Sequence, residues 1–358
     1  MKKLFALALA FAAIFSAQAQ DAKTLYEQAK KLDDAFTKAL PTQIKPDQKP
    51  NAEQAQGLLD AMEIYQKVME LDQMPNEKGQ VKPKYTDKIQ KSLLKHTVNN
   101  DFFTAGLIFN QQGMNYPQAY EAFMLSGQMQ GMMGAVPDTI YAADFVNAGN
   151  MAYGQDFKAA AAAYTAARQA NTQNENAYVY NIGALQQIAV ADSTYKTATK
   201  DIAAIAKEGI DRFGYGNDFL VNNYLQSFFE DGNFEGALAE LAKIESADPK
   251  NANVYRLRGI ISNAKHDYLN AIPAFKKMAE LTDNADYLLK AAGDLNSIGK
   301  AIMGNLNAPT PEAKSQLLDI FNAALHIAEK AAQNPEAASQ AQYDIDDIKY
   351  NIENAEKL

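Results

Sequence analysis

The chain has 358 residues, with 34 basic and 43 acidic side chains that give a formal net charge of −9. It has no cysteine, which excludes disulfides, thiolate metal sites and a thiol nucleophile. The acidic balance argues against nucleic acid as a partner, because that binding relies on clustered Lys and Arg. The apolar content is that of a globular protein, and the length fits two domains or one elongated array.

Residues 1–19 have the pattern of a secretory signal peptide. Lys2 and Lys3 precede an apolar run from Leu4 to Phe15, and Ala17 and Ala19 then follow in A-x-A spacing. Cleavage after Ala19 removes two lysines, so the mature charge becomes 32 − 43 = −11. The run is too short to span a bilayer, and no later segment is long and apolar enough. We therefore expect an exported protein that does not span a membrane and, without cysteine, is not a lipoprotein.

Residues 20–99 predict degenerate helical hairpins joined by proline-rich linkers. A helix over residues 22–40 is expected to pair with one that contains Ala61, Tyr65 and Val68. The linker from Pro41 to Pro50 should be extended, and a second break is expected from Pro75 to Pro83.

Residues 100–306 repeat with a fixed period. Segment 231–251 aligns with segment 266–284 so that Phe234 pairs with Tyr268, Ala237 with Ala271 and Leu241 with Phe275, each 34 residues apart. A small residue followed four positions later by a large apolar one, at this period, is typical of stacked helix pairs. Ala119 and Ala160 carry the pattern backwards with insertions.

The insertions and the end of the chain complete the predicted organisation. Extra residues fall at 127–137, which we expect to form a Gly- and Met-rich loop, and at 194–213, a longer second helix. Residues 307–358 predict the partner of a long helix that ends near Leu306, followed by a capping helix. The sequence thus predicts about seven hairpins, a C-terminal cap and almost no strand.

This pattern resembles the tetratricopeptide repeat (TPR) family, with Asp248-Pro249 where a repeat of that family closes. The resemblance covers residues 100–305 well and both ends loosely. It implies an all-α solenoid of stacked antiparallel helix pairs, a superhelix whose first helices line a concave groove that binds peptides.

That geometry places polar side chains and tyrosines on or near the groove. Amides pair well with a peptide backbone, and tyrosine offers a flat surface with a polar tip. The implied groove residues are Gln111, Tyr180, Asn181, Asn222, Asn223, Gln226, Arg256, Asn263 and Lys290, with Gln112, Tyr153, Gln187, Glu230 and Asp294 nearby. A purely solvating surface explains the same residues.

Candidate reactive groups each have a simpler structural explanation. Asp231, Asn233 and Glu235 match half of a calcium loop, but Ala242 stands where a bidentate Glu is needed. The methionines around residues 127–137 offer Cu(I) ligands, yet they also suit an irregular packing junction. His96, His266 and His326 fall in separate hairpins. We therefore expect no enzyme activity, no cofactor and no metal.

The sequence favours a secreted protein–protein interaction scaffold of the bacterial cell envelope, in the periplasm or outside the cell. Its groove would hold a peptide segment of a protein partner. The alternative is a solute- or glycan-binding module of an outer-membrane uptake system, against which the missing Trp weighs mildly. A structural spacer without a ligand is the third possibility.

Overall fold

The structure is a computed structural model that describes residues 21–42, 49–75, 79–113, 115–134, 138–192, 198–305 and 310–358. The expected signal peptide, most of the 41–50 linker and the start of the 194–213 helix lie outside these residues. The helices are α1 (Ala22–Ala39), α2 (Ala52–Asp72), α3 (Thr86–Val98), α4 (Asp101–Gly113), α5 (Tyr116–Met133), α6 (Asp138–Ala152), α7 (Phe157–Gln169), α8 (Asn176–Ala191), α9 (Ala198–Phe213), α10 (Asp218–Glu230), α11 (Phe234–Ala247), α12 (Ala252–Ala264), α13 (Tyr268–Leu281), α14 (Ala285–Asn305), α15 (Pro311–Ala331) and α16 (Ala338–Glu356). The described residues contain no strand.

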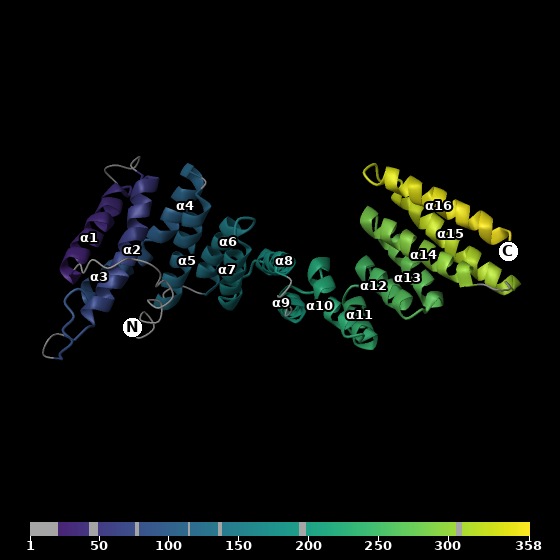
Figure 1. Ribbon diagram of the computed structural model, residues 1–358, viewed down its shortest axis with the longest axis horizontal. Helices are drawn as coiled ribbons and strands as arrows, with labels where there is room; N and C mark the ends of the chain where they lie inside the picture. Colours follow the sequence, from purple (N-terminus) through teal and green to yellow (C-terminus); the bar gives the residue numbers. More distant parts are fainter. Residues whose placement is uncertain are drawn as a thin grey trace. The chain divides into compact units, whose positions relative to one another are not determined.

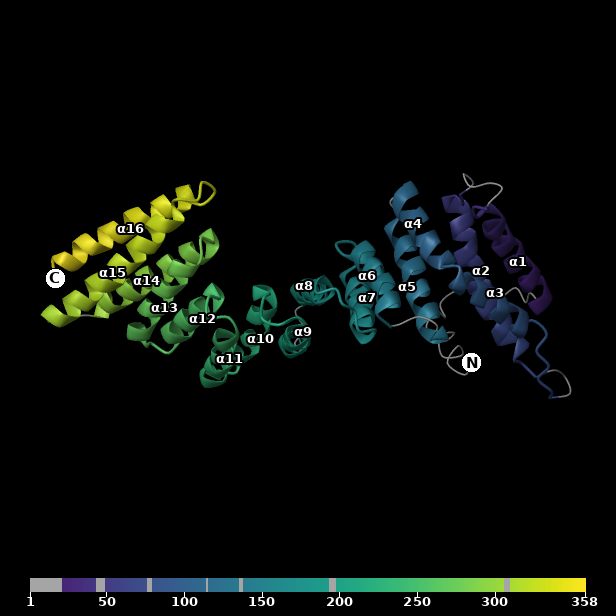
Figure 2. The ribbon, with the colours of Figure 1, turned by 180° about the vertical axis from the view of Figure 1, so that it is seen from behind.

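The chain divides into two compact units, residues 1–214 and 215–358 (Figure 1). The domain boundaries expected at 99/100 and 306/307 stay predictions. In each unit consecutive helices pair and then pack on the next pair, as the order of α4 to α7 and of α12 to α15 shows from both sides (Figure 2). The described helices form seven such pairs, with α3 and the final α16 outside them, which confirms the all-α stacked-hairpin fold.

The 34-residue period is exact for the first two hairpins of unit 2. Helices α12 and α13 begin 34 residues after α10 and α11. The turns inside both hairpins place a left-handed residue at the same repeat position, Gly232 with φ 66° and His266 with φ 57°. Asn217, Asn233 and Asn251 start their helices by accepting hydrogen bonds from backbone N–H groups of the first turn.

The predicted Gly- and Met-rich loop at 127–137 is wrong for its larger part. Helix α5 continues to Met133 and ends at Gly134, whose φ is 59°. Tertiary packing explains why the glycines stay helical: a methyl group on Gly127 would lie 2.8 Å from the Phe145 ring of α6. The insertion therefore lengthens α5, and Met129 lies in the core of unit 1.

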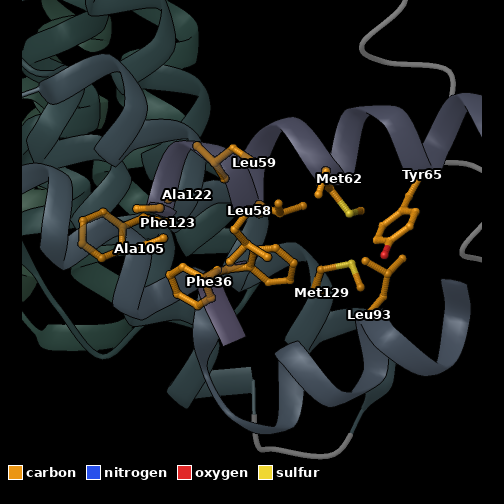
Figure 3. Close-up of a cluster of buried hydrophobic side chains, with 14 of the residues drawn as sticks. Phe36, Leu58, Leu59, Met62, Tyr65, Leu93, Ala105, Ala122, Phe123 and Met129 are labelled. Atoms are coloured by element: carbon orange, nitrogen blue, oxygen red, sulfur yellow. The ribbon is translucent and has the colours of Figure 1, made fainter. Parts of the chain in front are cut away.

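The core of the N-terminal hairpins is continuous across α1 to α5. Phe36, Leu58, Leu93 and Phe123 come from four helices and are almost fully buried (Figure 3). The burial of one such side chain stabilises the folded state by about 1.5–3 kcal/mol. No single hairpin buries these side chains alone. Even the degenerate first pair is thus held by its neighbours.

Asp72, at the end of α2, fixes the start of α3. Its carboxylate accepts hydrogen bonds from the backbone N–H groups of Lys84, Tyr85 and Thr86 at 2.8–2.9 Å. These bonds satisfy donors that a helix N-terminus leaves without partners, and they lower the pKa of Asp72 against the effect of burial. A distant residue thus caps the helix that follows the break expected at residues 75–83.

Each of four hairpins brings a glycine of its first helix against an aromatic ring of its second. The pairs are Gly106 with Phe123, Gly149 with Tyr164, Gly259 with Phe275 and Gly299 with Phe321. A methyl group on these glycines would lie 2.7, 2.6, 2.5 and 2.4 Å from the ring. No real Cβ tolerates such distances, so the contact requires glycine.

In the last of these pairs, the position of the glycine–ring contact no longer follows the 34-residue period. Gly293 lies 34 residues after Gly259, but a methyl group on it would meet nothing within 4 Å. The contact has moved to Gly299 because α14 and α15 are each 21 residues long, against 13 and 14 for α12 and α13. The longer helices cross one or two turns further along the chain.

Gly259 and Gly293 give a matched test of the helix contact. We expect Gly259→Ala to lower the free energy of unfolding by about 1–3 kcal/mol through overpacking against Phe275. Gly293→Ala should leave stability unchanged or raise it by up to about 1 kcal/mol, since alanine favours helix. Thermal and urea unfolding measure both variants, and equal behaviour would contradict the assignment of the contact.

A buried ionic network joins the helices of the N-terminal hairpins. His96 of α3 is 1% exposed, and its Nδ1 and Nε2 lie 2.7 Å from Asp101 Oδ2 and 2.9 Å from Asp33 Oδ1. Tyr65 and Ser92 donate to the second oxygen of Asp33 at 2.9 and 2.7 Å. Helices α1, α2 and α3 are therefore tied to the start of α4.

The network holds His96 and Asp33 in charged form. Burial by itself lowers the pKa of His96, but the hydrogen bonds to Asp101 and Asp33 outweigh it and raise this pKa to about 9. Burial likewise raises the pKa of Asp33, and the bonds from His96, Ser92 and Tyr65 overcome that effect and lower it to about 2. With His96 fully enclosed, the network stabilises the fold and offers no access to a substrate.

The shifted pKa values predict a pH dependence of stability. The pKa of His96 in the folded protein lies above its ordinary 6.5, so its contribution to the free energy of unfolding is complete below pH 6.5 and is lost as the pH rises towards 9. The pKa of Asp33 lies below its ordinary 3.8, so its contribution to the free energy of unfolding is complete above pH 3.8 and is lost as the pH falls towards 2. The difference in melting temperature between the native chain and His96→Gln should shrink from pH 6.5 to 9. A constant difference would contradict the charged state of His96.

Candidate functional site

The first helices of three consecutive hairpins in unit 2 bring a set of polar side chains together. Arg256 of α12 donates from Nε and Nη2 to Asn253 Oδ1 at 2.9 and 2.7 Å, and from Nη2 to Asn222 Oδ1 of α10 at 2.8 Å. Asn253 Nδ2 also donates to Asn222 Oδ1 at 3.1 Å. Asn222 and Arg256 lie 34 residues apart, so equivalent positions of adjacent repeats meet.

Tyr287 of α14 completes the set on the other side of Arg256. Its ring centroid lies 4.7 Å from the guanidinium carbon, and its hydroxyl donates to Asp218 Oδ2 of α10 at 2.7 Å. Burial, aided by Asp218, raises the pKa of Tyr287 to about 12, which keeps the hydroxyl a donor. Asp218, Asn222, Asn253, Arg256 and Tyr287 are called the Arg256 cluster below.

The cluster orients a half-buried guanidinium before any ligand arrives. Amides on one side and an aromatic ring on the other restrict its side chain, which reduces the entropy lost on binding. A planar guanidinium with fixed orientation suits a carboxylate or a peptide carbonyl better than a mobile lysine does.

The remaining predicted groove residues of unit 2 flank this cluster. Asn223 Nδ2 donates to the Phe219 carbonyl at 2.8 Å, Gln226 Nε2 donates to Glu230 at 3.3 Å, and the exposed Lys290 pairs with Asp294 at 2.7 Å. Asn263 is half-buried near the end of α12. The structure therefore brings Asn222 and Arg256 into direct contact, with the others on the same three helices.

Asn181 is placed differently from the prediction. It is fully buried, donates to the Ala161 carbonyl at 2.9 Å and accepts from Arg168 Nη1 at 2.9 Å. Its side chain joins α7 to α8 and faces no ligand, because the interhelical contact uses both ends of the amide. A groove role for Asn181 is thus wrong in this structure.

Other predicted residues of unit 1 lie at the surface. Tyr180 of α8 is 40% exposed and Tyr153, in the turn after α6, is 37% exposed, with ring centroids 5.3 Å apart. Gln111 and Gln112 are exposed near the end of α4. Tyr153 and Tyr180 thus form an uncharged aromatic surface between the end of α6 and α8.

Sequence reasoning missed three members of the Arg256 cluster, namely Asp218, Asn253 and Tyr287. A signal was present for two of them, because Asn253 and Tyr287 are 34 residues apart and so occupy the same repeat position. Asp218 had no such signal, since its partner Tyr287 lies 69 residues away.

Within the part of the chain that the structure describes, no group of three or more His, Asp or Glu side chains is arranged to hold a metal ion. None of the described helices is long and apolar enough to cross a bilayer.

Comparison with known proteins gives no family. No family model matches the chain, and no curated protein matches it. Among solved structures, a human IFIT1 dimer with m7Gppp-AAAA is 13% identical, covers 89% of this chain and 83% of its own, and has a TM-score of 0.28. The P58(IPK) TPR domain is 10% identical, with coverages of 94% and 80% and a TM-score of 0.24. These scores are too low to carry an argument, so the fold assignment rests on the helices themselves.

The two roles assigned to amides are separable by unfolding experiments. Asn181→Ala should lower the free energy of unfolding by about 1–3 kcal/mol, because it leaves the Ala161 carbonyl and Arg168 without this buried partner. Gln226→Ala, which removes an exposed amide, should change stability by less than about 0.5 kcal/mol. Urea titration followed by circular dichroism measures both, and a harmless Asn181→Ala would restore that residue as a groove candidate.

Proposed function

We propose that this protein is a non-enzymatic interaction scaffold that binds an extended peptide segment of a protein partner across α10, α12 and α14. The observation that carries the proposal is the Arg256 cluster, in which three first helices present one oriented guanidinium. Asn222 and Arg256 meet on this surface because they occupy equivalent positions of adjacent repeats, although they lie 34 residues apart in the chain. The amides and Lys290 around it supply further donors and acceptors for a peptide backbone.

We also propose that the protein works outside the cytoplasm, in the periplasm or cell envelope of a bacterium. The basic start, apolar run and A-x-A site of residues 1–19 support this. An N-terminus at Gln20 in protein recovered from its native cells is the expected observation, and an intact Met1 there would contradict it.

Arg256 allows a direct test of the binding face. Peptides selected from a displayed library of short linear sequences should bind the full chain, and fluorescence anisotropy gives their affinity. Arg256→Met should weaken binding about tenfold or more, equivalent to about 1.4 kcal/mol, because the oriented guanidinium is lost. Arg256→Lys should restore little, since lysine cannot reproduce the bonds to Asn253 and Asn222 that orient the charge.

Arg258→Met is the matched control, because Arg258 projects about 200° around the same helix from Arg256. It should leave peptide affinity unchanged. The proposed face would be contradicted if no peptide were selected. It would also be contradicted if Arg256→Met and Arg258→Met lost peptide affinity equally while their melting curves stayed unchanged.

One observation favours the glycan-binding alternative. The exposed rings of Tyr153 and Tyr180 form an aromatic surface of the kind that stacks on sugar rings. A glycan array decides between the two: a bound sugar whose retention is lost in Tyr180→Ala supports the alternative, and an empty array removes it.

A further inference from the structure

A second candidate site lies on another side of α12. A cavity of about 400 Å³ opens between α12 and α13, with Leu238 of α11 at its border. Its volume falls within the range of small-molecule sites, which combine apolar lining with a few convergent polar groups. Ile261 and Pro273 provide apolar lining, and Tyr255 adds an aromatic ring.

Basic side chains are concentrated at this cavity although the chain as a whole is acidic. Arg258, Lys265 and Lys277 line it with one acid, Asp267, and each of the three also pairs with a glutamate that does not itself line the cavity. The chain carries a formal charge of −9, so this concentration runs against its overall balance. The lining itself thus holds more basic than acidic groups, which suits an anion that replaces these glutamates as their partner.

The two lysines are held only by exposed ion pairs, whereas the ion pair of Arg258 is half-buried. Lys265 pairs with Glu235 at 2.6 Å and Lys277 with Glu280 at 2.9 Å, and the lysine side chains are 38% and 48% exposed. Exposed pairs of this kind contribute little, so either lysine can turn to a ligand at small cost. Arg258 Nη2 pairs with Glu245, while its buried Nε has no hydrogen-bond partner in the described structure.

The repeat itself does not require two of these three charges; Lys277 has a basic equivalent, Lys243, 34 residues earlier. The positions 34 residues before Arg258 and Lys265 hold Tyr224 and Asp231, an uncharged ring and an acid. Helices α10 and α11 form their hairpin with those residues, so packing alone does not explain the basic pair at the cavity.

We propose that this cavity binds a small organic molecule that carries two or more oxyanion groups, carboxylate or phosphate. Arg258 and the two lysines bind the oxyanions, which replace the glutamates as their partners. Tyr255 and the apolar lining contact the carbon skeleton. The site is independent of the peptide face proposed above, because Arg256 and Arg258 project to different sides of α12.

Isothermal titration calorimetry of the full chain tests this with two probes, citrate for polycarboxylates and glucose 6-phosphate for phosphate esters. We expect saturable binding of at least one probe, and the one that binds identifies the oxyanion. Lys277→Gln and Arg258→Met should each weaken that binding about tenfold or more.

Two controls remove one charge from nearby positions outside the cavity. Lys276→Gln changes the neighbour of Lys277 on α13, and Arg256→Met changes the peptide face. Both should retain the affinity of the native chain for the probe. Absence of saturable heat with both probes would overturn the proposal, and so would equal affinity in Lys277→Gln and Lys276→Gln. Because Lys277 is exposed, its variant keeps the test valid if Arg258→Met does not fold.

Discussion

The close contact between a helical glycine and an aromatic ring sets the geometry on which the rest of this structure depends. It occurs in four hairpins, where a single methyl group would collide with the ring. A ring held against bare backbone lets two helices approach closely, and it fixes where along their length they cross. Hairpins built with the same crossing then stack with the same offset, so one repeat presents its side chains next to those of the following repeat.

The Arg256 cluster depends on the stacking of α10, α12 and α14, although α10 has Leu225 where α12 has Gly259. Asn222 and Arg256 occupy the same position of adjacent repeats, and their hydrogen bond forms only because α10 and α12 lie at a constant offset. Tyr287 joins them from α14 and returns a hydrogen bond to α10. Three helices thus orient one guanidinium, the feature on which the proposed peptide face rests. The cavity lies on the other side of α12, so both proposed surfaces share this helix.

The N-terminal hairpins of unit 1 depend on a different interaction. Their helices share an apolar core, and in the middle of it His96 lies between the carboxylates of Asp33 and Asp101. Buried charges are costly unless they are paired and hydrogen-bonded, and here Tyr65 and Ser92 satisfy the second oxygen of Asp33. The network specifies how α1, α3 and α4 meet, since each supplies a group that the others need.

The sequence by itself determined the helices, the 34-residue repeat and most of the pairing, because apolar periodicity and small-residue spacing are local properties of the chain. It also placed Asn222 and Arg256 on one face. It failed at residues 127–133, where glycines suggest a loop, because only the rings of Tyr141 and Phe145 on another helix explain why they remain helical. It failed at Asn181, whose amide the contact between α7 and α8 uses completely. The tertiary structure alone decided the charge state of His96, the partner of Asp218 and the cavity beside Arg258. Each of these depends on side chains brought together from positions that no local pattern relates.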